Sequence, residues 1–296
     1  MKYQRPNNKG DIDAVETEIK IIQKLKEINN WENIVEFYDI FPLQENRWIF
    51  TMLPIKYDLF KHLMSEGRRD PLLLDHPSYN KPILTQLTRL KFIQSMINGI
   101  HVLHQNGIFH QDIKSDNLLV GSDDVLKFTD SGLSSYNEEG NNRRRSEHWK
   151  GTSDYMSPDL VKLMWCPLMS DGYDRHTNDL WALMVVIFEI YDTDWWWSTV
   201  LDGKNGTAPL DAAKIISSMS DGAVFKEKVR EIPTCPLMGA NELDGLLDLL
   251  FEYTMEVKPA TTQEEESNSA TWKDTMTSKL SELNRIIESQ KSSIAS

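Results

Sequence analysis

The chain has 296 residues, 40% of them hydrophobic, which is enough for a sizeable core in one large domain or two modest ones. Its formal net charge of -13 argues against nucleic acid or an anionic membrane as the main partner, because both require a basic face; solubility is the simpler meaning of this charge. The two cysteines form no CxxC pair, which argues against a zinc site or disulfide framework and favours a reducing compartment, cytoplasmic or nuclear.

The longest apolar stretch, residues 180–190, has about 11 residues, whereas a helix needs roughly 20 to cross a bilayer. The N-terminus is polar and has no apolar core typical of a signal peptide. We therefore expect neither a signal peptide nor a membrane span.

The N-terminal region predicts one helix followed by two strands. Apolar residues at spacings of three and four in residues 13–28 are typical of an amphipathic helix. Residues 34–41 and 47–53 are apolar and aromatic runs joined by a short polar segment, which predicts a hairpin.

From residue 58 onward the pattern changes to helices. Helices are predicted at residues 58–64 and 84–104, with a proline-containing loop between them. Residues 179–191 are apolar on all sides, which predicts a helix at the centre of a core. A small mixed region thus precedes a larger helical one.

The C-terminal region has two features that point to contacts. After a polar, acidic linker at residues 263–270, an amphipathic tail helix within residues 271–296 either docks on the body or forms a coiled-coil contact. Its apolar positions recur at helical spacing, namely Trp272, Met276, Leu280, Leu283 and Ile287. The consecutive Trp195, Trp196 and Trp197 either pack at a helix end or form a partner site.

The stretch HQDIKSDN, residues 110–117, contains the groups that phosphoryl transfer requires. This reaction needs a positioned nucleophile, cations to neutralise phosphate charge, and oxygen ligands for a metal. Asp112 is a candidate acceptor for a hydroxyl proton, Lys114 is a cation, and Asn117 offers a neutral oxygen to magnesium. A loop whose side chains alternate in direction can point all three groups into one cleft.

A second candidate metal ligand follows in the segment LKFTDSG. Asp130 ends an apolar strand, eighteen residues after Asp112. Gly132 is expected to give the backbone freedom for a sharp turn directly after this carboxylate.

With these motifs the chain resembles the eukaryotic protein kinase superfamily. That family carries HRDLxxxN, DFG and APE motifs, an upstream lysine and a glutamate on a helix. In the same order, GTSDYMSPD at residues 151–159 is similar to the family's GTxxYMAPE, and NDLW at residues 178–181 is similar to its DxW helix start. Four motifs in order are far less expected by chance than any one of them.

The resemblance implies an α+β, bilobal protein-kinase fold over residues 1–262. Residues 1–53 would be a reduced, β-rich N-terminal lobe that lacks the glycine-rich loop, and residues 54–262 the larger, mainly helical C-terminal lobe. Either the lobe itself is reduced or the sequence is incomplete at its N-terminus. Without this loop the ATP phosphates lose the backbone N–H donors that it supplies.

The resemblance also assigns roles to the two carboxylate motifs. Asp112 would be the catalytic base, Lys114 the γ-phosphate contact, and Asn117 with Asp130 the magnesium ligands. Thr152 would hydrogen-bond Asp112 and Lys114. Lys114 and the GTxxY-like segment point to serine or threonine of a protein substrate as the acceptor.

Further residues are implied to position ATP. Glu18 would pair with Lys2, the lysine sixteen residues before it. Met52 to Pro54 would form the hinge, after Thr51 as gatekeeper, and Leu119 would lie under the adenine.

Among the departures from the family pattern, which include Asp159 for the glutamate of APE and Met184 for a glycine, three bear on the expected active site. Gln111 replaces the arginine that binds a phosphorylated loop in many members, and Ser131 replaces the phenylalanine after the metal aspartate. Pro54 has no N–H to offer at the hinge. Two functions stay open: an ATP- and magnesium-dependent serine/threonine kinase, or an impaired pseudokinase that acts as a binding module.

Overall fold

The computed structural model describes most of the chain up to residue 191 and five single residues near the C-terminus. The described residues are 2–4, 6, 8–43, 47–55, 57–67, 84–137, 145–165, 167–169, 172–191, 278, 281, 285, 288 and 289. The predicted tryptophan cluster, the linker and the apolar stripe of the tail helix lie outside them. Partner contacts through those segments therefore stay predictions.

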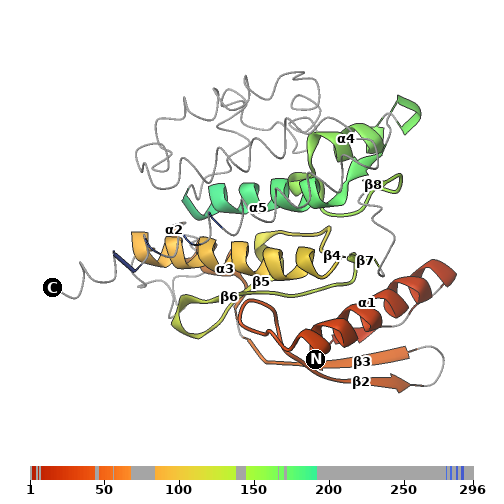
Figure 1. Cartoon of the computed structure of the whole chain (residues 1–296), viewed down its shortest axis with the longest axis horizontal. Coiled ribbons are helices and arrows are strands. Elements are labelled where there is room, and N and C mark those ends of the chain that lie inside the picture. The colour runs from red at the N-terminus through yellow and green to blue at the C-terminus, as the bar shows by residue number, and fades with distance from the viewer. Residues whose placement is uncertain are drawn as a thin grey trace.

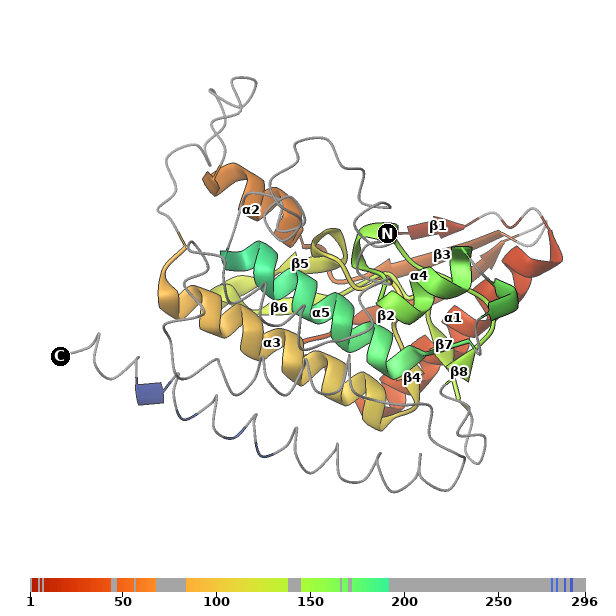
Figure 2. The same cartoon turned by 90° about the horizontal axis from the view of Figure 1, so that it is seen from above.

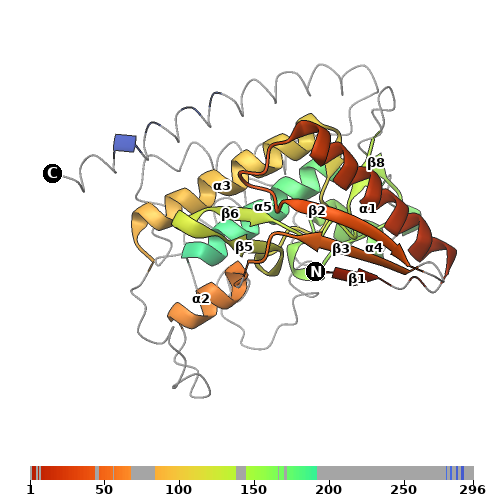
Figure 3. The ribbon, with the colours of Figure 1, turned by 90° about the horizontal axis from the view of Figure 1, so that it is seen from below.

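The fold is α+β and bilobal, with a small N-terminal lobe built of one helix and an antiparallel sheet (Figures 1 and 3). The strand order is β1-β3-β2. The elements are β1 (Lys2–Gln4), α1 (Lys9–Ile28), β2 (Phe37–Leu43) and β3 (Arg47–Met52). The hairpin predicted for residues 34–53 is present, with Ile40 opposite Phe50.

Two boundaries in this lobe differ from the prediction, each for a local reason. Helix α1 begins four residues early because Asn8 Oδ1 accepts a hydrogen bond from the Asp11 N–H at 2.9 Å and caps it. Strand β2 begins only at Phe37, because Ile34 instead bridges Phe128 of the large lobe.

The large lobe is mainly helical, with short strand pairs between its helices (Figure 2). Its helices are α2 (Leu59–Gly67), α3 (Gln86–Gln105), α4 (Pro158–Trp165) and α5 (Arg175–Tyr191), with 3-10 turns at Ser115–Asn117, Ser122–Asp124, Ser153–Tyr155 and Pro167–Met169. The strands are β4 (Ile108–Phe109) with β7 (Ser135–Tyr136), β5 (Leu118–Val120) with β6 (Leu126–Phe128), and β8 (Arg145–Ser146) with β9 (Tyr173–Asp174).

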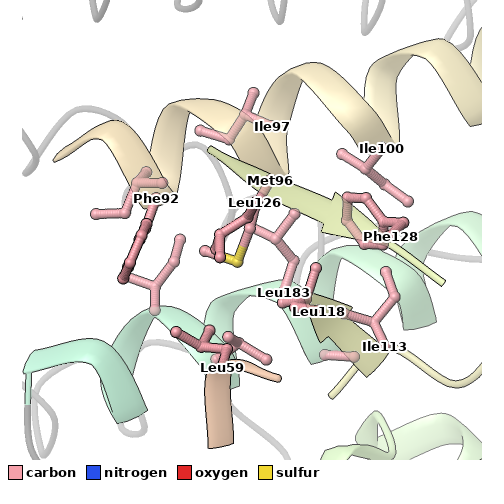
Figure 4. Packing of buried hydrophobic residues seen from close by; sticks show 14 of the residues in the cluster. Leu59, Phe92, Met96, Ile97, Ile100, Ile113, Leu118, Leu126, Phe128 and Leu183 are labelled. Atoms are coloured by element: carbon pink, nitrogen blue, oxygen red, sulfur yellow. The ribbon is translucent and has the colours of Figure 1, made fainter. Parts of the chain in front are cut away.

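The core of this lobe lies between α3, α5 and the β5–β6 pair (Figure 4). Met96 of α3, Leu118 of β5 and Leu183 of α5 are fully buried there. Burying a large apolar side chain contributes about 1.5–3 kcal/mol, so this contact is a main source of stability. The prediction of a core helix at residues 179–191 is confirmed. The helix starts earlier, at Arg175, because Asp174 Oδ1 accepts from the Thr177 N–H at 3.0 Å.

Within the described ranges, no helix combines the length and the apolar character that a membrane span requires.

Candidate active site

Asp112, Lys114 and Thr152 form one hydrogen-bonded cluster. The Thr152 hydroxyl donates to Asp112 Oδ1 at 2.7 Å, and Lys114 Nζ donates to Thr152 Oγ1 at 3.0 Å. Lys114 Nζ also lies 3.4 Å from Asp112 Oδ2. The contacts expected for Thr152 are thus formed, and they fix the direction in which the Asp112 carboxylate faces.

Asn117 extends this cluster toward the expected metal position. Its Nδ2 group donates to the Asp112 backbone carbonyl at 2.8 Å and to Asp112 Oδ2 at 3.0 Å. Both amide hydrogens are used in this way, so Oδ1 is the atom left to face a cation. An amide oxygen of this kind is a suitable ligand for magnesium.

Asp179, near the start of α5, anchors residues 110–117, the expected catalytic loop, to the core. Its carboxylate is fully buried and accepts from the His110 N–H at 2.8 Å and the Gln111 N–H at 2.7 Å. The His104 ring Nε2 lies 2.9 Å from Asp179 Oδ2. These partners satisfy the buried carboxylate and tie the loop to α5, whose residues 180–187 are all buried.

His110 has a structural position. Its Nε2 lies 3.0 Å from the carbonyl oxygen of Thr129, directly before Asp130, and its Nδ1 accepts from the Asp112 N–H at 3.3 Å. The side chain therefore links the catalytic loop to the second carboxylate motif.

Lys2 joins the two lobes at the site. Its Nζ donates to Glu18 Oε1 at 2.8 Å and to Asp130 Oδ1 at 2.7 Å. Burial alone would lower the pKa of Lys2, but the two carboxylates outweigh it and raise that pKa above its ordinary value. Burial likewise opposes ionisation of Asp130, yet Lys2 lowers the pKa of Asp130 overall. Both groups are charged at neutral pH.

Gln4 makes a contact with Glu18 that sequence reasoning missed. Its Nε2 donates to Glu18 Oε2 at 2.7 Å. The sequence could have indicated this contact, because Gln4 follows Lys2 by two residues and therefore lies on the same face of β1. Glu18, which is fully buried, thus has Lys2 and Gln4 as partners.

The turn after Asp130 differs from the expectation in one respect. The left-handed backbone angle belongs to Asp130, with φ 62°, whereas Gly132 is not in the left-handed region. Gly132 instead leaves space for two side chains, because a Cβ there would make tight contacts of 3.1 Å with Asp130 Oδ1 and 3.3 Å with Lys2 Nζ. Its N–H donates to Asp130 Oδ1 at 3.2 Å.

The expected hinge follows β3 directly. Met52 ends that strand, and the Leu53 N–H donates to the Glu36 carbonyl at 2.8 Å. Pro54 is exposed and has no N–H. Leu119 lies on β5, where it forms a bridge with Asp58 just beyond the hinge.

Ser131 borders a small, mostly apolar cavity at the junction of the two lobes. The cavity is lined by Leu25, Ile34, Phe37, Leu103, Ile108, His110, Phe128, Thr129, Ser131 and Ser134. A phenylalanine in place of Ser131, as in the family pattern, would face this apolar lining, but the cavity has room for only about one water molecule.

A buried polar network lies behind the catalytic loop and was not predicted. Ser115, fully buried between Lys114 and Asn117, lies 3.2 Å from the Tyr155 hydroxyl, which donates to Glu189 Oε1 at 2.8 Å. Burial raises the pKa of Glu189 to about 7. No short sequence motif joins these residues, because they come from three separate segments.

Comparisons with known proteins agree with this geometry. The family model described as "Protein kinase domain" matches residues 1–268. An Aurora kinase of Candida glabrata is 28% identical over 158 residues, which cover 53% of this chain and 37% of that protein. CBL-interacting serine/threonine-protein kinase 24 of Arabidopsis thaliana is 26% identical over 179 residues, covering 60% of this chain and 34% of that protein.

A solved structure shares the fold. The yeast RNA Pol II CTD kinase CTDK-1 complex contains a chain that superposes with a TM-score of 0.52 and 18% identity, covering 88% of this chain and 68% of that one. The chain spans only about a third of the two curated relatives named above. Because the family model matches nearly the whole chain and the site carries the family's motifs in place, the chain belongs to the protein kinase family.

Proposed function

We propose that the chain is a protein serine/threonine kinase that transfers the γ-phosphoryl group of ATP to a protein hydroxyl group with the help of Mg²⁺. One observation carries this proposal: Lys2 bonds Glu18 and Asp130 at the same time, which joins the two halves of the site in one charged assembly. Among the relatives that match, CBL-interacting serine/threonine-protein kinase 24 of Arabidopsis thaliana is named as a kinase of this class.

The residues fit the magnesium ion and the nucleotide in chemical type. Asp130 and Asn117 Oδ1 supply the carboxylate and amide oxygens that would hold magnesium, and this ion would neutralise phosphate charge when bound. Lys2 would turn from Asp130 to the phosphates, while Glu18 and Gln4 keep it in place. Met52, Pro54 and Leu119 would border the adenine.

Asp112 and Lys114 would carry the transfer step. The bond between the β-phosphate oxygen and the γ-phosphorus breaks, and the acceptor hydroxyl oxygen bonds to that phosphorus. The hydroxyl proton goes to the Asp112 carboxylate, which Thr152 orients. Lys114 neutralises charge on the transferring group. The products are ADP and a phosphorylated protein.

The test is phosphate transfer from labelled ATP to a generic protein substrate, with magnesium present. We expect transfer to serine and threonine, identified by phosphoamino acid analysis. Asp112→Asn should lower turnover by about 10²–10⁴-fold, the usual share of a positioned base, and Asp130→Ala should abolish transfer. Asp13→Asn, an exposed carboxylate on α1, is the matched control and should keep wild-type turnover.

Unchanged turnover in Asp112→Asn or Asp130→Ala contradicts the proposal. A wild-type chain without transfer, but folded, instead favours the second function, a pseudokinase. The observations behind that alternative are the missing donor at Pro54 and the serine at residue 131.

A further inference from the structure

The residue directly before the proposed base has an unusual environment. Gln111 is 2% exposed and its backbone is left-handed, with φ 62°. Its Nε2 donates to the Leu133 carbonyl at 2.8 Å, and its Oε1 accepts from the Tyr173 hydroxyl at 2.9 Å. Tyr173 is fully buried. A neutral amide thus bridges two distant segments beside Asp112.

Only one orientation of the Gln111 amide satisfies both neighbours. A backbone carbonyl can only accept, so the amide must present its NH₂ group to Leu133 and its oxygen to Tyr173. The Tyr173 hydroxyl must then donate. Burial, followed by the Asp179 carboxylate, raises the pKa of Tyr173 to about 12, so this hydroxyl keeps its proton at neutral pH.

The bridge connects the catalytic loop to the segments on both sides of it. Leu133 follows the metal-ligand position Asp130 by three residues, and the next side chain, Ser134, donates from Oγ to the His110 carbonyl at 3.1 Å. Tyr173 lies on β9, where it stands opposite Ser146 of β8. Strand β8 precedes the segment that contains Thr152. The Gln111 amide therefore contacts the segment after Asp130 directly and reaches the β8 segment only through Tyr173.

We propose that Tyr173 is a positioning residue: through the amide of Gln111 it holds the segment after Asp130 against the catalytic loop. This inference rests on the proposed kinase function and extends it to a residue that lies 61 positions from Asp112 in the sequence. Without the hydroxyl, Gln111 Oε1 is left buried without this donor, and only the bond to the Leu133 carbonyl still holds the amide in place.

The first test measures steady-state phosphate transfer by the full chain in Tyr173→Phe, Gln111→Leu and the double variant. Tyr173→Phe keeps the ring, so we expect it to lower kcat about tenfold through misplacement of the loop, with KM for ATP within about twofold. The double variant should match Gln111→Leu alone, because the hydroxyl then has no amide to orient. Tyr38→Phe, with a side chain 42% exposed on β2, is the control and should keep wild-type kcat.

Two outcomes overturn the inference. One is a kcat of Tyr173→Phe within twofold of wild type. The other is a double variant whose fold reduction in kcat equals the product of the reductions in the two single variants. Loss of thermal stability with unchanged kcat per folded molecule is a case of the first outcome, because that is the result of a purely structural role.

A second readout needs no activity. Amide hydrogen exchange of residues 131–137 should become several-fold faster in Tyr173→Phe and stay unchanged in Tyr38→Phe. If the wild-type chain transfers no phosphate, the proposed function fails, while faster exchange still supports the bridge. Unchanged exchange in Tyr173→Phe overturns the bridge whatever the activity.

Discussion

The two halves of the active site are held by different kinds of interaction. The catalytic loop is anchored by Asp179, a fully buried carboxylate that binds two backbone N–H groups and lies against a histidine ring. The nucleotide half depends on Lys2, whose side chain is 25% exposed, and on Asp130, whose side chain is 50% exposed. Exposed ion pairs are weakened by water and salt, whereas buried, fully bonded networks are not. The catalytic geometry is therefore the more robust half.

The largest effect is expected from Asp179→Asn. An amide in this position keeps one oxygen but presents an NH₂ group toward one of the two backbone N–H groups, which leaves that buried donor unpaired. We expect the free energy of unfolding to fall by about 3 kcal/mol, together with most of the phosphate transfer. Urea denaturation followed by fluorescence measures the first quantity. Asp13→Asn serves as control, and equal stability of both variants would show that the catalytic loop does not depend on this anchor.

Lys2→Met should affect turnover more than folding. It removes the cation that joins Glu18 to Asp130, and we expect kcat to fall about 10²-fold, as for the loss of one charged stabilising group. The pair with Asp130 is solvent-accessible, so the melting temperature should change by only a few degrees. Lys9→Met, an exposed lysine at the start of α1, is the matched control. A larger loss of stability than that of Asp179→Asn would reverse the comparison between the two halves.

Glu189→Gln should reveal a pH dependence behind the catalytic loop. Burial raises the pKa of Glu189 from 4.5 to about 7 in the folded protein, so the unfolded chain releases this proton first. Wild type should therefore lose stability relative to Glu189→Gln as the pH rises from about 4.5 to 7, and the difference should be constant above that range. Denaturation series at several pH values measure it. A difference that does not vary with pH would mean that Glu189 titrates normally.

The smallest effect is expected from Ser131→Phe. The cavity beside Ser131 has room for only about one water molecule, so the aromatic ring must push the apolar lining aside, and the free energy of unfolding should fall by about 1 kcal/mol. Ser131→Ala, which removes the hydroxyl without filling the cavity, is the control. A rise in the free energy of unfolding would contradict this prediction.

Sequence reasoning reached the catalytic half of the site because its residues are close together in the chain. Asp112, Lys114 and Asn117 lie within six residues, and the spacing to Asp130 completes the pattern. Tyr173, 62 positions from Gln111, was missed because only the tertiary fold brings it there. The boundaries of α1 and α5 were predicted late for a simpler reason: the caps Asn8 and Asp174 precede the apolar pattern that predicted each helix.

The hinge has a consequence for the chemistry of inhibitors. The Leu53 N–H is already bonded to the Glu36 carbonyl, and Pro54 has no N–H, so these two positions offer carbonyl oxygens to a ligand. A flat heterocycle that relies on accepting a hydrogen bond from the hinge at Pro54 loses that contact here. Compounds that present N–H donors toward the hinge should be favoured over matched analogues that present ring nitrogens, which would give this site a selectivity of its own.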